Sequence, residues 1–126
     1  MGHILLIDAE REFALPTADL LRREGYAVLM EADGRTALDL ARGHSPALIL
    51  LGTELLRMGG LEVLRELQRN GIRTPVVVLS RHDRSPIVAQ AMFRGAAAFL
   101  RKPVDPNVLL RTVARLTRPL TEAVPA

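Results

Sequence analysis

The residues of this sequence best suited to chemistry follow apolar runs. Three such runs are followed directly by Asp8, Gly52 and Ser80, and a fourth, Phe99-Leu100-Arg101, is followed by Lys102. Unbroken apolar runs are typical of parallel strands that are buried on both faces. In an open α/β sheet the carboxyl ends of the strands lie at one edge, where ligands bind. We therefore expect an acid, a hydroxyl and an amine to meet in one site, to which Gly52 contributes no side chain.

The segments between these runs have the period of amphipathic helices. Helices are expected at about residues 12–23, 36–42, 61–69, 86–94 and 106–117, and a further strand at residues 26–30. Strict alternation of strand and helix predicts right-handed βαβ units. The fold class is therefore predicted to be α/β, a flavodoxin-like sandwich with a five-stranded parallel sheet in the order 2-1-3-4-5.

Proline and glycine refine the limits of these elements. Pro16 is expected to start or kink the first helix, because proline lacks an amide donor. The pair Asp33-Gly34 is expected to form a turn. Ser85 and Asp105 each precede a proline, which is the pattern of an N-cap followed by the first helical residue.

Length and composition limit the classes of protein to which the chain could belong. Its 126 residues suit one domain, expected to span residues 1–118 and to be followed at residues 119–126 by a tail or the start of a linker. The lack of cysteine excludes disulfides, thiol catalysis and cysteine zinc sites. There is no signal-peptide pattern and no apolar stretch near the roughly 20 residues of a membrane span, so a soluble cytoplasmic protein that does not bind membranes is expected.

The charge of the chain is mildly basic. A net charge of +3, with three Phe and one Tyr, offers neither a strong electrostatic footprint nor stacking platforms, so no direct binding of nucleic acid is expected. The histidines His3, His44 and His82 lack the spacing of metal ligands and are expected at the surface.

Several separated segments agree in order and spacing with one known family. They include ILLID at residues 4–8, GLEVL at residues 60–64 and RKPVD at residues 101–105. Over about residues 3–117 the chain resembles a response regulator receiver domain, the CheY-like module of two-component (phosphorelay) signalling. The resemblance implies a fold of the class predicted above and a role in signal transduction.

The resemblance also implies a phosphorylation site of four parts, and this chain departs from two of them. Two acids after the first strand would hold Mg²⁺, but Asp8 is followed here by Ala9. An aspartate at the end of the third strand would accept the phosphoryl group, but Gly52 stands there. The family's hydroxyl and amine match Ser80 and Lys102. The site implied by the resemblance is therefore degenerate.

The missing groups change the chemistry that such a site can perform. An acyl phosphate requires a carboxylate oxygen as nucleophile, and glycine has none. Phosphoryl transfer also depends on a metal, which carboxylates usually help to hold. Because Asp8 is expected to be the single remaining acid, we predict that it contacts Lys102 directly or through water, with no metal and no cofactor. No catalytic residue is assigned, and the chain is expected not to be an enzyme.

Each site residue also has a purely structural interpretation. Asp8 could cap the following helix, Ser80 could form a turn, and Lys102 could be a solvated strand end. Gly52 could mark a tight bend. The occurrence of all four at strand ends favours a degenerate receiver site over coincidence.

A substitute acceptor is the alternative that keeps phosphorylation. Thr53 and Glu54 directly follow Gly52. Strand alternation predicts that Thr53 points to the opposite face, and Glu54 lies further into the loop. A true phospho-accepting receiver that uses Thr53 or Glu54 is therefore the second hypothesis. A third, a flavodoxin-like cofactor binder, requires a hydroxyl-rich phosphate loop, whereas the residues after the first strand are acidic.

The resemblance implies an output face formed by the fourth helix, the fifth strand and the fifth helix. Phe99 holds the position of the family's switch aromatic and is expected to prefer a buried rotamer. The same face carries Arg94, Arg101, Arg111 and Arg115. Such a face favours an acidic partner over a second copy, although a solvated arginine-rich face is the alternative. We expect a monomer or weak dimer that binds another signalling protein or a fused output domain.

Overall fold

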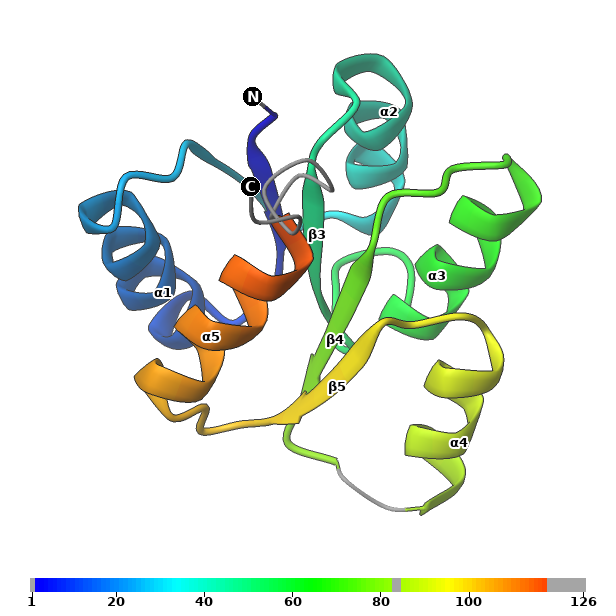
Figure 1. Cartoon of the computed structure of the whole chain (residues 1–126). Coiled ribbons are helices and arrows are strands. Elements are labelled where there is room, and N and C mark those ends of the chain that lie inside the picture. Colours follow the sequence, from blue (N-terminus) through cyan, green and yellow to red (C-terminus); the bar gives the residue numbers. More distant parts are fainter. Residues whose placement is uncertain (1, 83–84, 118–126) are drawn as a thin grey trace, which may run out of the picture.

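The computed structural model describes residues 2–82 and 85–117. Within these ranges strands and helices alternate along the chain (Figure 1), with the bounds β1 (Ile4–Ile7), α1 (Arg11–Arg23), β2 (Val28–Glu31), α2 (Gly34–His44), β3 (Leu48–Gly52), α3 (Gly60–Arg69), β4 (Val76–Ser80), α4 (Ser85–Phe93), β5 (Ala98–Arg101) and α5 (Pro106–Thr117). The strands form a parallel sheet in the order β2-β1-β3-β4-β5. The predicted flavodoxin-like fold class is therefore confirmed.

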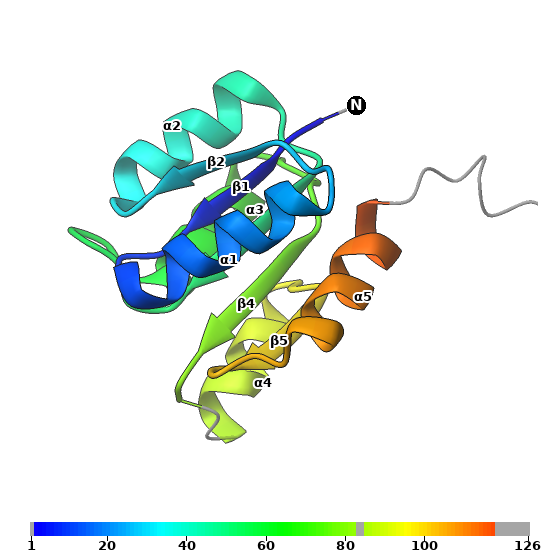
Figure 2. The ribbon, with the colours of Figure 1, turned by 90° about the vertical axis from the view of Figure 1, so that its left-hand side faces the viewer.

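Two layers of helices enclose the sheet (Figure 2). Successive side chains of a strand point to opposite faces, so β1 contributes Leu5 and Ile7 to one core and Ile4 and Leu6 to the other. The first core packs against α2, α3 and α4, and the second packs against α1 and α5. All four β1 side chains are buried, which explains why the strand is an unbroken apolar run in the sequence.

The helices α1 and α2 begin earlier than the sequence predicts. α1 begins at Arg11, so Pro16 lies inside this helix and does not start it. α2 begins at Gly34 rather than at residue 36, because the side chain of Asp33 accepts two backbone amides of the first turn at 2.9 and 3.1 Å. Asp33 is therefore a helix N-cap, and the predicted turn at Asp33-Gly34 is wrong.

The predicted beginning of α5 is confirmed. Asp105 accepts the amide of Asn107 at 2.7 Å, and Pro106 is the first helical residue. α4 begins at Ser85, whose side chain lies outside the described residues, as do residues 118–126, which include the expected tail. Within the described ranges, every helix falls short of the length and apolar character needed to span a bilayer.

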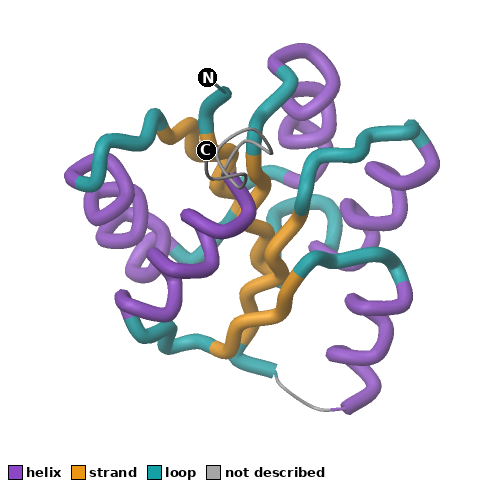
Figure 3. The backbone as a smooth tube through the Cα atoms, viewed as in Figure 1, coloured by secondary structure: helices purple, strands orange, loops and turns teal. Residues whose placement is uncertain are grey.

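Parallel pairing brings the carboxyl ends of the strands to one edge of the sheet, and Figure 3 shows the strands in orange between the helices. Gly52 of β3 pairs with Leu79 of β4, and Ser80 pairs with Arg101 of β5. Gly60, the first residue of α3, approaches β3 so closely that a Cβ there would lie 2.0 Å from the carbonyl oxygen of Gly52. α3 can therefore begin beside the end of β3 only with glycine at this position.

Candidate functional site

A pocket opens at the carboxyl edge of the sheet, where the strand ends converge. It is lined by the predicted site residues together with several others: Asp8, Ala9, Glu10, Thr53, Glu54, Ser80, Arg81 and Lys102. The structure thus brings the acid, the hydroxyl and the amine together, as the strand-end pattern predicts. Sequence reasoning gave no role to Glu10 or Arg81.

Asp8 and Lys102 form a buried ion pair. The Nζ atom of Lys102 lies 2.7 Å from Oδ2 of Asp8, and the two side chains are 7% and 1% exposed. The predicted contact is confirmed as a direct one, and Lys102 is not a solvated strand end. Oδ2 has no aligned hydrogen-bond donor among the described residues, so attraction between the charges holds this pair.

The second oxygen of Asp8 shapes the turn before α1. Oδ1 accepts the backbone amide of Glu10 at 2.9 Å. The N-cap position of α1 is Glu10 itself, which makes no side-chain cap hydrogen bond. Asp8 therefore closes the turn that leads into the helix but does not cap the helix.

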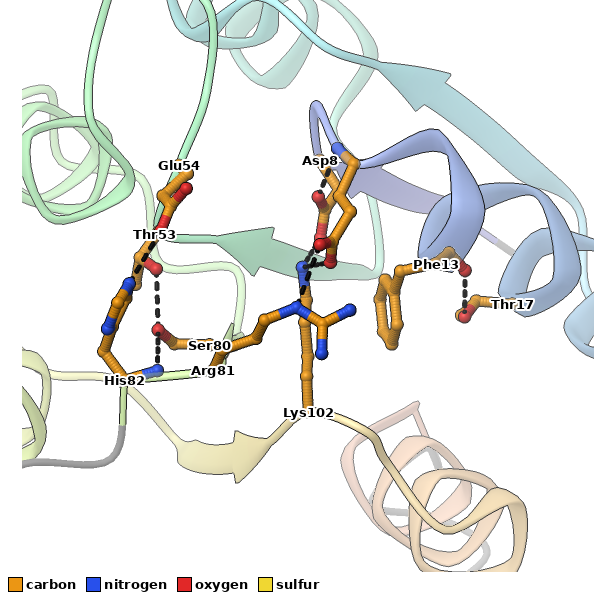
Figure 4. Close-up of polar contacts among 10 residues, drawn as sticks. Asp8, Phe13, Thr17, Thr53, Glu54, Ser80, Arg81, His82 and Lys102 are labelled. Carbon is orange, nitrogen blue, oxygen red and sulfur yellow. Dashed lines mark hydrogen bonds and ion pairs between the residues drawn. The ribbon is translucent and has the colours of Figure 1, made fainter.

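The missing side chain at Gly52 leaves room for the Asp8 carboxylate. A Cβ on Gly52 would lie 2.6 Å from Oδ2 and 2.8 Å from Cγ of Asp8. The carboxylate thus fills space that a side chain at the end of β3 would need. On α1, the Phe13 ring lies beside Lys102 (Figure 4), with Nζ 4.4 Å from the ring centroid, which is suitable for cation–π attraction.

Glu10 supplies a second carboxylate to the pocket. Its Oε1 lies 3.1 Å from Lys102 Nζ, and its Oε2 lies 2.9 Å from Arg81 Nε. The expectation that Asp8 is the single acid is therefore wrong. The resemblance implies a second acid at residue 9, where this chain has Ala9. The turn that Asp8 closes instead brings Glu10, one residue later, into the pocket.

The pairing of Glu10 makes stability depend on pH. The guanidinium of Arg81 and the ammonium of Lys102 lower the pKa of the Glu10 carboxyl below its ordinary value of 4.5. The unfolded chain therefore binds this proton at a higher pH than the folded chain does. The resulting stabilisation is fully present above the unfolded pKa and is lost as the pH falls through the lowered folded pKa.

We expect Glu10→Gln to lower the urea midpoint relative to wild type at about pH 7, and to differ from it less at about pH 3. Urea unfolding followed by circular dichroism at both pH values measures the difference. A gap of equal size at the two pH values would contradict the pairing of Glu10 as its cause.

A second set of contacts engages the hydroxyl at the end of β4 (Figure 4). Ser80 Oγ accepts the Thr53 hydroxyl at 2.8 Å and the His82 amide at 3.0 Å. The His82 ring lies 2.7 Å from a carboxylate oxygen of Glu54. The prediction that Thr53 points to the opposite face is wrong, because Thr53 follows the last residue of β3 in a bend, where strand alternation no longer applies.

Comparison with known proteins identifies the family to which this fold and site belong. The family model of the response regulator receiver domain matches residues 4–114. The chain belongs to this family.

The receiver domain is 33% identical over 117 residues to the transcriptional regulatory protein YkoG of Bacillus subtilis, covering 93% of this chain and 51% of the relative. It is 32% identical over 111 residues to the transcriptional regulatory protein PdtaR of Mycobacterium tuberculosis, with coverage of 87% and 54%. The chain thus spans about half the length of these curated relatives.

Solved structures resemble the receiver domain over most of its length. The receiver domain of NtrX from Brucella abortus superposes with a TM-score of 0.84 at 29% identity, covering 90% of this chain and 97% of that one. The receiver domain of the Francisella response regulator 1452 gives a TM-score of 0.88 at 23% identity, with coverage of 93% and 97%. At that identity the second likeness concerns the fold alone.

The predicted switch aromatic of the receiver domain is half-buried. Phe99 lies in β5 and packs against the core that includes α2, α3 and α4. The ring is therefore less enclosed than the expected buried rotamer implies. Of the predicted basic residues, Arg94 is half-buried and the others are exposed: Arg101, Arg111 and Arg115.

The three histidines do not form a metal site. His44 and His82 are exposed, as predicted, whereas His3 is half-buried and its ring lies edge-on to His44 at 6.2 Å. The expected surface position of His3 is therefore only partly correct. Across residues 2–82 and 85–117, no three or more His, Cys, Asp or Glu side chains are grouped so that they could hold a metal ion.

Proposed function

We propose that this domain is an atypical receiver that serves two-component (phosphorelay) signal transduction without phosphorylation at the end of β3. Gly52, the last residue of β3, carries the proposal because it has no side chain. An acyl phosphate forms when a carboxylate oxygen attacks phosphorus. The adjoining carboxylate, Asp8, is 1% exposed and is paired with Lys102, so it is shielded from a phosphoryl donor.

The acids of the pocket do not fit the Mg²⁺ ion that the family implies. Mg²⁺ demands octahedral oxygen ligands and is usually bound through one or two carboxylates. Asp8 is paired with Lys102, and Glu10 is paired with both Lys102 and Arg81. The side chain of Ala9 offers no oxygen. We therefore propose a degenerate site with no metal, no other cofactor and no catalytic residue, in a domain that is not an enzyme.

A basic face supports signalling through protein contacts. The helices α4 and α5 flank the edge strand β5 (Figure 1), and Arg101, Arg111 and Arg115 are exposed there. α4 also exposes Phe93, whose side chain is 85% accessible. Basic and apolar side chains together favour a partner that presents acidic and apolar groups. The proposed partner is another signalling protein or an output domain joined to this one.

A net charge of only +3 and four aromatic residues, three Phe and one Tyr, give little basis for direct binding of nucleic acid. The domain itself contacts neither nucleic acid nor membrane, and it acts in the cytoplasm as a monomer or weak dimer. Like charges on the basic face would oppose close pairing of two copies through it.

Incubation with acetyl phosphate and Mg²⁺, followed by intact mass measurement, tests the proposal. The wild-type chain is expected to gain no adduct of about 80 Da. A receiver domain that has the β3 aspartate, treated in parallel, should gain it. A stable adduct on this chain would overturn the proposal in favour of a phospho-accepting receiver, and the variants Thr53→Val and Glu54→Gln would then locate the phosphoryl group.

A further inference from the structure

The two oxygens of Glu10 contact cations that come from different parts of the chain. Oε1 lies 3.1 Å from Lys102, which follows β5, and Oε2 lies 2.9 Å from Arg81, which follows β4. Glu10 itself precedes α1, so one carboxylate connects three loops at the edge of the sheet. A carboxylate that accepts from two cations makes the kind of charge-assisted contacts that a bound oxyanion would make.

The other polar groups around the end of β4 are also engaged by this chain. Ser80 Oγ accepts from Thr53 and from the amide of His82, and the His82 ring contacts Glu54. An external anion in this pocket would need the ammonium of Lys102, the guanidinium of Arg81 and the hydroxyl of Ser80. Each of these groups already contacts another residue of the chain.

Burial decides which of these contacts can hold the segment after β4. The His82 and Glu54 side chains are 55% and 79% exposed, and an ion pair that is so solvated contributes little. The Glu10–Arg81 contact is also partly solvated, with side chains 34% and 55% exposed, but Glu10 is held in addition by Lys102, which is only 7% exposed. Charge attraction is stronger at that buried end, where water screens it less. Glu10 is therefore the principal anchor, and it reaches the segment through Arg81.

We propose that Glu10 is an internal anion that fixes Arg81 and His82, the two residues that follow β4, in place of an external phosphoryl group. This inference deepens the proposed function and rests on it. The segment keeps one position whether or not a phosphoryl donor is present.

Amide hydrogen exchange of the whole chain, measured residue by residue by NMR, tests this inference. The His82 amide, which donates to Ser80 at 3.0 Å, reports on the segment. The Ala97 amide, which donates to Val76 at 2.8 Å at the other end of β4, reports on the rest of the sheet. Glu10→Gln is expected to speed exchange at His82 by about tenfold and to speed exchange at Ala97 by a clearly smaller factor, because only the loss of global stability acts at Ala97.

Two further variants make the result decisive. Arg81→Gln removes the guanidinium that contacts Glu10. Because the Arg81 side chain is 55% exposed, this variant should repeat the effect at His82 without disturbing the core. Glu62→Gln, at an exposed position of α3, is the matched control and should change neither amide.

Unchanged exchange at His82 in Glu10→Gln and Arg81→Gln would overturn the anchoring role of Glu10. Exchange that rises by the same factor at His82 and Ala97 would also overturn it, because the loss of global stability would then account for the whole effect at His82. A phosphoryl adduct on the wild-type chain would instead overturn the proposed function, so the two failures are distinguishable.

Discussion

Replacing Lys102 with methionine is expected to lower the free energy of unfolding by about 3 kcal/mol. The substitution keeps much of the apolar stem of the side chain but removes its charge. Asp8, which is 1% exposed, then keeps a buried negative charge without its cation. Such a charge is costly because the protein interior replaces its hydration poorly. Urea unfolding at neutral pH, followed by circular dichroism, measures the change.

A double variant separates the contribution of charge from that of packing. Asp8→Asn/Lys102→Met removes both charges at nearly constant shape, so its loss is expected to be about 1 kcal/mol, well below that of Lys102→Met alone. Arg111→Met, at an exposed position of α5, is the control and should change stability by less than about 0.5 kcal/mol. Equal losses for the single and double variants would mean that packing, rather than the ion pair, explains the effect.

The buried ion pair and the missing acceptor are parts of one arrangement. The Asp8 carboxylate lies where a Cβ on Gly52 would come within 2.6 Å of it. In that position it is 2.7 Å from the Lys102 ammonium, so the cation is neutralised within the chain. Glu10 adds a second carboxylate at 3.1 Å. The same contacts therefore stabilise the fold and leave the lysine without free charge to attract a phosphoryl group.

The sheet could be predicted wherever both faces of a strand are covered. β1, β3 and β4 are buried at every residue, so each is an apolar run that the sequence displays directly. β2 is an edge strand with half-buried and exposed side chains. Its expected limits, residues 26–30, accordingly differ from the observed Val28–Glu31.

The site could be predicted where side chains directly follow strands, and not where the backbone turns away from them. Asp8 and Lys102 directly follow β1 and β5, so the order of the strands predicts that they share a site, and the resemblance to a receiver domain predicts their contact. Thr53 lies in a bend, and the rule of alternating faces therefore failed for it. Glu10 enters the pocket through a turn. This turn is closed by the backbone amide of Glu10, which donates to the side chain of Asp8. The signal in the sequence that could have placed Glu10 in the pocket is the occurrence of an acid two residues after Asp8.

Restoring the two missing carboxylates is expected to restore phosphoryl transfer. Gly52→Asp alone would force a Cβ to within 2.6 Å of Asp8 Oδ2, so it should destabilise the domain by about 2 kcal/mol. It should also stay unmodified, because residue 9 still lacks the second acid that would help to hold Mg²⁺. Ala9→Asp/Gly52→Asp supplies both a further acid for Mg²⁺ and a nucleophile. With acetyl phosphate, an oxygen of the carboxylate introduced at position 52 attacks phosphorus and acetate leaves, which adds about 80 Da to the intact mass.

The matched control for this gain of function is Ala9→Asp/Gly52→Asn, which keeps nearly the same shape but lacks the nucleophilic carboxylate. It is expected to gain no mass under identical conditions. If a folded Ala9→Asp/Gly52→Asp variant also stays unmodified, the lack of a nucleophile at Gly52 is not sufficient to explain the behaviour of the wild-type site. A phosphoryl group in the pocket would need the cations Lys102 and Arg81, which Glu10 contacts. Adding Glu10→Gln to that variant frees these cations, so a gain of about 80 Da would show that the contacts of Glu10 exclude the phosphoryl group.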